Sequence, residues 1–122
     1  VRMPPARSTD TTLLQVAADT LKNPDYESAG GWRRLVINYD LQHKEKWEGE
    51  YRTGTVQDTV TVYHYVWDEF QVTTAEKVGD RYFMFANRLK YLQPGGPTTP
   101  TGRWILADRF QTTEILEANI DK

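Results

Sequence analysis

The segment Thr55–Thr74, TVQDTVTVYHYVWDEFQVTT, decides the fold of this chain. Its side chains change character at every second position, which predicts a β-strand because successive side chains of a strand point to opposite faces. A strand with one solvated face alternates apolar with charged residues. Here one face is mainly aliphatic and the other carries threonine and aromatic residues: Val56, Val60, Val62, His64, Val66, Phe70 and Val72 against Thr59, Thr61, Tyr63, Tyr65 and Trp67. We therefore expect a strand that is covered on both faces.

The overall composition is that of one soluble globular domain. The chain has 122 residues, of which 39% are hydrophobic and 26% are charged, and this length can build a single core. The formal net charge is −2, and the lysines and arginines are spread along the chain. Proteins that bind nucleic acid usually carry a basic patch, so we expect no nucleic acid partner.

The residue types exclude several kinds of site. The chain contains no cysteine, which excludes disulfides, thiolate metal sites and catalysis by cysteine. With two histidines and no cluster of carboxylates, we expect neither a metal site nor a cofactor. No run of about 18 apolar residues occurs, so we expect no membrane span. Because the chain begins with Val1 rather than Met, we expect a processed chain or a soluble domain of a longer protein, and its compartment stays open.

One helix is predicted, at Asp10–Lys22. Asp10 or Thr11 can cap its first turn, and apolar residues recur along it at helical spacing. Asn23-Pro24 ends it, because the residue before a proline disfavours the helical conformation. Residues 1–9 are predicted to be a flexible arm, with a docked extension as the alternative, so that residues 10–122 form the single domain.

The rest of the chain predicts sequential strands at Trp32–Gln42, Lys46–Thr53, Thr55–Thr74, Arg81–Gln93 and Arg103–Thr113. The polar segment His43–Lys46 is predicted as a hairpin turn, with a short helix as the alternative, and Val78-Gly79-Asp80 as a second turn. Thr55–Thr74 is longer than an ordinary strand, so we expect a bulge near Trp67–Glu69. A tight turn at Asp68-Glu69 is the alternative. Glu114–Lys122 is expected to be an extension or a short terminal helix.

This order of elements predicts an α+β fold, in which an N-terminal helix packs on a curved antiparallel sheet of about five to six strands. Long strands that are apolar on both faces, with a bulge, favour strong curvature. The alternative is a small antiparallel β-barrel of the calycin type, in which Gly31-Trp32 would begin the entry strand.

The closing segment Gly102–Phe110, GRWILADRF, resembles the tryptophan-bearing final strand of NTF2-like proteins. The order of one helix followed by consecutive strands also resembles the cystatin-like and NTF2-like architectures, in which a curved antiparallel sheet surrounds helical elements. NTF2-like proteins usually spend more of their first half on helix than this chain does. The resemblance implies a pocket between helix and sheet, lined by His64, Tyr63 or Tyr65, and Trp104.

The row Tyr63, Tyr65 and Trp67 is the most suggestive feature for function. Side chains two residues apart on a strand lie about 7 Å from one another on the same face. Such a row suits an interface, where Tyr and Trp are enriched, but it also suits the protein's own core. One short helix cannot cover a whole sheet, so we predict a non-enzymatic interaction domain that pairs with itself as a homodimer or docks on a larger protein assembly.

An enzyme is the alternative function. His64 lies among valines and could act as a general base, because its pKa lies near neutrality, although a core histidine with a satisfied hydrogen bond would look the same. Asp68 shares its face but lies about 13 Å further along an extended strand, so the two form no direct pair. In an NTF2-like isomerase or dehydratase, His64 or Asp68 would be the base. An NTF2-like small-ligand-binding protein with the same helix–sheet pocket is the other form of this alternative.

Overall fold

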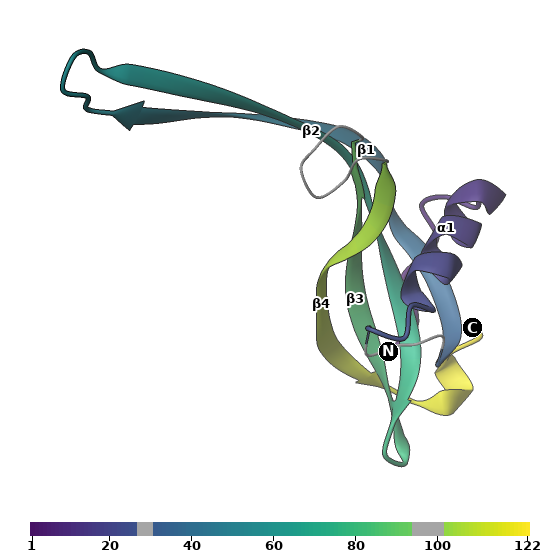
Figure 1. The fold of residues 1–122 in the computed structure, drawn as a ribbon. Coiled ribbons are helices and arrows are strands. Elements are labelled where there is room, and N and C mark those ends of the chain that lie inside the picture. Colours follow the sequence, from purple (N-terminus) through teal and green to yellow (C-terminus); the bar gives the residue numbers. More distant parts are fainter. Residues whose placement is uncertain (27–30, 94–101) are drawn as a thin grey trace.

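The computed structural model describes residues 1–26, 31–93 and 102–122 (Figure 1). Each strand of its antiparallel sheet pairs with the next along the chain, in the order β1-β2-β3-β4. The prediction of one helix beside an antiparallel sheet is confirmed. The elements are α1 (Thr11–Leu21), β1 (Trp32–Arg52), β2 (Thr59–Val78), β3 (Arg81–Leu92), β4 (Arg103–Ile115) and the short 3-10 helix η1 (Glu117–Asn119).

The predicted number of strands is wrong. The described residues contain four strands rather than five or six, and the molecule is mostly β. The strands expected at Trp32–Gln42 and Lys46–Thr53 are one continuous strand, β1. Within these residues the sheet is also open, with β1 and β4 as its two edges, so the alternative of a closed barrel does not fit.

The predicted hairpin turn at His43–Lys46 lies in the middle of β1. His43 pairs with Asp68 and Lys46 pairs with Tyr65, so the strand continues through this segment without a break. The segment is charged because both of its faces meet solvent, and it lacks the Asn-Gly or Asp-Gly sequence that favours a tight turn. The reversal occurs instead between β1 and β2, where the backbone N–H of Gly54 donates to Asp58 Oδ1 at 3.2 Å.

The predicted bulge lies in the neighbouring strand. From Trp67 to Val78, β2 pairs with β3 without any shift in register. The irregularities nearest to this position fall in β1, between Ile37 and Tyr39 and between Tyr39 and Gln42, where β1 has more residues than the stretch of β2 that it faces. Extra residues in one strand bend it and increase its twist. The pattern of β2 could not reveal them, because the additional residues belong to its partner.

The helix forms where it was predicted and covers one face of the sheet. Asp10 is the N-cap, and its Oδ1 accepts a hydrogen bond from the backbone N–H of Leu13 at 3.0 Å. Ala17 and Leu21 are fully buried, so packing holds a helix that is too short to be stable alone. The cluster that α1 builds with the sheet contains Ala17, Leu21, Ile37, Phe70, Val72 and Leu89.

The opposite face of the sheet is covered by the two ends of the chain. Met3 packs with Ile115 and Ile120 against Val36, Ala75 and Met84. The backbone N–H of Arg7 donates to the carbonyl of Ile37 at 2.8 Å, and Ser8 forms an isolated bridge with Ile37. Met3, Arg7 and Ser8 of the N-terminal segment thus contact the sheet. The C-terminal segment ends in η1, a short helix of the kind expected there.

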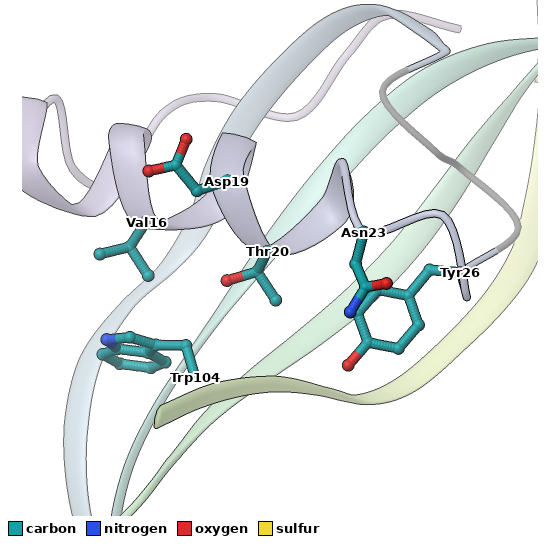
Figure 2. A pocket seen from close by; sticks show the side chains of 6 residues that line it. All are labelled: Val16, Asp19, Thr20, Asn23, Tyr26 and Trp104. Atoms are coloured by element: carbon teal, nitrogen blue, oxygen red, sulfur yellow. The ribbon is translucent and has the colours of Figure 1, made fainter. Parts of the chain in front are cut away.

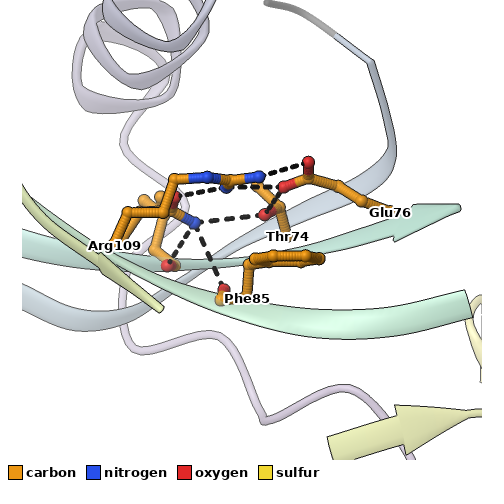
Figure 3. Close-up of polar contacts among 6 residues, drawn as sticks. Thr74, Glu76, Phe85 and Arg109 are labelled. Carbon is orange, nitrogen blue, oxygen red and sulfur yellow. Dashed lines mark hydrogen bonds and ion pairs between the residues drawn. The ribbon is translucent and has the colours of Figure 1, made fainter. Parts of the chain in front are cut away.

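A polar network is buried in the face that α1 covers (Figure 3). Arg109 and Glu76 form a paired ion bridge, with Nη2–Oε1 and Nη1–Oε2 distances of 2.5 and 2.7 Å, and their side chains are 9% and 8% exposed. Thr74 donates to Glu76, Asn87 accepts from Arg109 at 2.7 Å, and the guanidinium lies 4.3 Å from the ring centre of Phe85. Each charge is neutralised by its partner, which burial requires.

Candidate protein-interaction site

A two-stranded extension, which we call the β-finger, projects from the sheet (Figure 1). It comprises Lys44–Arg52 of β1, Thr59–Trp67 of β2 and the turn between them. The pairing of β2 with β3 ends where Trp67 faces Leu92, so beyond that point β2 pairs, among the described residues, with β1 alone. Eight residue steps at 3.3 Å each make the paired part about 26 Å long. The candidate site is thus a ribbon with solvent on both faces.

One side of the β-finger, the valine face, is formed by the even positions of β2 and the odd positions of β1. Four large apolar residues of this face are exposed to between 60% and 64%: Trp47, Tyr51, Val60 and Val62. The rings of Trp47 and His64 stack in parallel, with centroids 3.8 Å apart, and His64 Nε2 lies 3.1 Å from Glu45 Oε2. The apolar residues of this face are of the kind found in a protein core, but they are exposed to solvent.

The other side of the β-finger, the tyrosine face, carries Tyr63 and Tyr65. Their rings are 6.2 Å apart and nearly parallel, and 40% and 46% of these two residues is exposed. The Tyr63 hydroxyl donates to Glu50 Oε2 at 3.2 Å. This hydrogen bond, together with the negative charge of Glu50, raises the pKa of Tyr63 above its ordinary value of 10.0. Ion pairs such as Lys46–Glu48 line the β1 half of the face.

Trp67 marks the base of the β-finger and is half-buried. Its Nε1 donates to Glu69 Oε1 at 2.8 Å, and Lys90 Nζ lies 4.3 Å from the centre of its ring. Trp67 therefore shares a face with Tyr63 and Tyr65, as the row predicted, but it is tied to the sheet. Of the predicted aromatic row, only the two tyrosines stand free of the body.

The two candidate catalytic residues do not meet. The side chain of His64 contacts that of Glu45 in the β-finger, whereas Asp68 Oδ1 lies 2.7 Å from His43 Nδ1 at the base of the β-finger. Each histidine thus has a carboxylate from the neighbouring strand beside it. A general base must lie within hydrogen-bonding distance of the proton that it abstracts, and His64 lies on an exposed ribbon that lines no pocket described here. The geometry gives no catalytic arrangement to this pair.

Trp104 lies outside the β-finger, in a pocket between α1 and β4 (Figure 2). Its ring meets Phe70 edge-on at 5.2 Å. The Tyr26 hydroxyl, at the far side of the pocket, accepts from the backbone N–H of Leu106 at 3.3 Å. The pocket measures about 340 Å³, and its lining among the described residues is Val16, Asp19, Thr20, Asn23, Tyr26 and Trp104. The structure therefore does not bring His64, Tyr63 or Tyr65 to Trp104.

The most exposed apolar residues of the β-finger include Trp47 and Tyr51, which the sequence did not single out as a site. Trp47 alternates with lysines and glutamates in KEKWEGEYR, and this pattern is typical of a strand that is not buried on either face. Such a segment predicts that Trp47 is exposed and does not belong to the core. The prediction of a turn at His43–Lys46 obscured the exposure of Trp47, because it placed Trp47 directly after a chain reversal.

Other kinds of site are not seen in the described ranges. Residues 1–26, 31–93 and 102–122 contain no group of three or more His, Cys, Asp or Glu side chains that could hold a metal ion. Across the same residues, no helix has the length and apolar character needed to cross a membrane. Comparison with known proteins gives no match to a family model, to a curated protein or to a solved structure.

Proposed function

We propose that this chain is a non-enzymatic protein-interaction domain that associates with itself through the β-finger. The observation that carries the proposal is the exposure of Trp47, Tyr51, Val60 and Val62 on one face of an uncovered ribbon. Exposed apolar patches that stand together mark interaction surfaces. Aromatic residues that offer a ring and a polar tip are enriched in such surfaces.

The stability of the β-finger supports the same proposal. A two-stranded ribbon in water is marginally stable, and independent stability needs three or more strands or a packing partner. Covering a large apolar side chain contributes about 1.5–3 kcal/mol. Association would give these side chains neighbours from a second chain, as the body gives neighbours to Phe70 and Val72 elsewhere on β2.

Deletion of the outer half of the β-finger tests the proposal. Gly49 and Val62 face each other across the ribbon, so residues 50–61 can be replaced by Asn-Gly, which favours a tight hairpin turn. Sedimentation over a concentration series should show a concentration-dependent dimer for the unchanged chain and a monomer for the deletion. Phe110→Ser removes a side chain of similar exposure, 60%, from β4 and is the matched control that should still dimerise.

Two results would overturn the proposal. One is an unchanged chain that sediments as a monomer throughout the series. The other is a deletion variant that dimerises as well as the unchanged chain, because the contact would then lie on the body. Urea unfolding of the deletion variant checks that the body is intact, since the core clusters do not include residues 50–61.

Binding of a small ligand between α1 and β4 is the second candidate function. It is favoured by the pocket of about 340 Å³, whose lining combines the Trp104 ring with the polar residues Asp19, Thr20 and Asn23. A volume of this size can hold a small molecule. A screen of small aromatic compounds by nuclear magnetic resonance would test it. Signals of α1 and β4 should shift on binding, and loss of the shifts in Trp104→Leu but not in Trp67→Leu would support the pocket.

A further inference from the structure

The outer edge of β2 in the β-finger is open. β3 ends at Leu92, opposite Trp67, so within the described residues Thr59–Val66 pairs with β1 on one side and with no strand on the other. The backbone N–H and C=O groups along such an edge are a ready template for another strand. The open stretch is eight residues long, which exceeds the usual strand length of about 5–6 residues.

The two edges of the β-finger differ in charge. Thr59–Val66, TVTVYHYV, contains no Lys, Arg, Asp or Glu, and β1 opposite it, Lys44–Arg52, reads KEKWEGEYR. Natural proteins protect exposed sheet edges with charged residues, above all lysine. Valine, threonine and tyrosine are the residues that strands favour. The β1 edge therefore carries the usual protection against strand pairing, and the β2 edge lacks it.

We propose that the β2 edge, Thr59–Val66, pairs antiparallel with the same segment of a second copy of this chain. This inference rests on the proposed self-association and specifies its surface. Antiparallel pairing of identical strands follows from a two-fold axis, in which each copy uses the same surface. Because the segment has no formal charge besides His64, no like charges are placed opposite each other, a contact that would be destabilising.

The position of the β-finger favours this geometry. It extends away from the body (Figure 1), so antiparallel pairing over eight residues puts the two bodies at opposite ends of the joint ribbon. Parallel pairing would force the bodies together at the same end. A two-fold axis beside Tyr63 sets Val60 opposite Val66 of the second copy, and the valine faces of the two copies join. The product is a four-stranded ribbon, which is more stable than two separate ones.

A second copy is favoured over a different strand because the segment is complementary to itself. Threonine and aromatic residues occupy its odd positions and valines occupy most of its even positions. The two-fold axis keeps each kind on its own face, where aromatic and β-branched residues form favourable cross-strand pairs. The segment therefore offers its copy matching residues along the whole open stretch.

Crosslinking through single cysteines tests the inference, because the chain has no cysteine of its own. Tyr63 of β2 and Glu48 of β1 face each other in the ribbon and point to the same side. In the proposed dimer the two copies of residue 63 lie in adjacent strands, whereas the two copies of residue 48 are separated by two further strands. Under mild oxidation, Tyr63→Cys should form the covalent dimer at least about tenfold faster than Glu48→Cys, since a disulfide needs Cα atoms within about 7 Å.

The outcomes separate this inference from the proposed function. If the variants still dimerise but Glu48→Cys crosslinks as fast as Tyr63→Cys or faster, pairing through the β2 edge is overturned. Association through the β-finger would then still stand. A monomer in sedimentation would overturn both. Distances between nitroxide labels on Thr61→Cys and Thr112→Cys variants give an independent check. Antiparallel pairing predicts a short distance for the label on the β-finger and a long one for the label on β4.

Discussion

The two halves of β2 carry the same pattern and meet opposite environments. In the inner half, Phe70 and Val72 are fully buried between α1 and neighbouring strands. In the outer half, Val60 and Val62 occupy the same face of the same strand and are 64% and 60% exposed. The alternation of a strand therefore predicts which side chains share a face. Whether that face is covered depends on where the neighbouring strand ends and which helix lies above it.

Charge shows the same contrast. Glu76 and Arg109 form their ion pair in the interior, where Thr74 and Asn87 add further hydrogen bonds. The β1 half of the β-finger carries its charges at the surface, as in the pair Lys46–Glu48. Interior ion pairs are costly to break because one charge is left buried and uncompensated, whereas exposed pairs contribute little. The body and the β-finger should therefore respond very differently to equivalent substitutions.

The largest effect is expected when the buried network is broken. Glu76→Ala leaves the Arg109 guanidinium without its partner and should reduce the free energy of unfolding by about 3–5 kcal/mol. Urea denaturation followed by circular dichroism measures it. The exposed pair Arg81–Glu114 gives the control, since Glu114→Ala should change stability by about 0–1 kcal/mol. Similar losses in the two variants would contradict the burial of the network.

The direct test of the two halves of β2 uses the same substitution at two valines. Val72→Ala removes two methyl groups from the core and should cost about 2–3 kcal/mol, from lost burial and the cavity left behind. Val62→Ala, ten residues earlier on the same face, should change the stability of the monomer by less than about 0.5 kcal/mol. The measurement is urea unfolding at a concentration below dimer formation. A large loss for Val62→Ala would mean that the valine face is covered within one chain.

A smaller effect is expected at the cap of α1, the helix that covers the inner half of β2. Asp10→Ala removes the hydrogen bond to the Leu13 N–H and should cost about 1 kcal/mol. Asp10→Asn retains an oxygen acceptor and is the matched control that should keep most of the stability. Thermal unfolding compares the three proteins. If Asp10→Asn loses as much as Asp10→Ala, the cap contributes through charge and not through its hydrogen bond.

The smallest effect is expected at the tyrosine face. Because Glu50 raises the pKa of Tyr63, Glu50→Gln should lower that pKa towards 10.0, the ordinary value. The interaction favours the protonated phenol of the folded chain. Its contribution to stability is therefore present below the ordinary pKa and is lost as the pH rises through the raised one. Ultraviolet absorbance of tyrosinate over a pH series measures the shift, with Glu48→Gln as control. An unchanged titration in Glu50→Gln would count against the Tyr63–Glu50 hydrogen bond.

Part of the candidate site could be predicted from the sequence. The row Tyr63, Tyr65 and Trp67 does share one face, because side-chain direction follows from strand alternation alone. The NTF2-like resemblance, which stays a prediction, implies that Trp104 lines one pocket together with Tyr63 or Tyr65. In the structure, Trp104 lies in the separate pocket beside α1. To group residues from distant strands, one must know the register in which the strands pair. The extra residues that set this register lie in β1, whereas the sequence predicts the bulge in β2.

The sequence by itself determined the local elements: the helix with its Asp10 cap, the alternation of β2 and the turn at Gly79, whose φ of 67° suits glycine. These depend on residues near one another in the chain, so the sequence carries the full signal. Only the tertiary structure decided that β3 ends opposite Trp67 and leaves the β-finger uncovered. Burial and ion pairing are made by residues far apart in sequence, such as Glu76 and Arg109, and no local pattern encodes which of them meet.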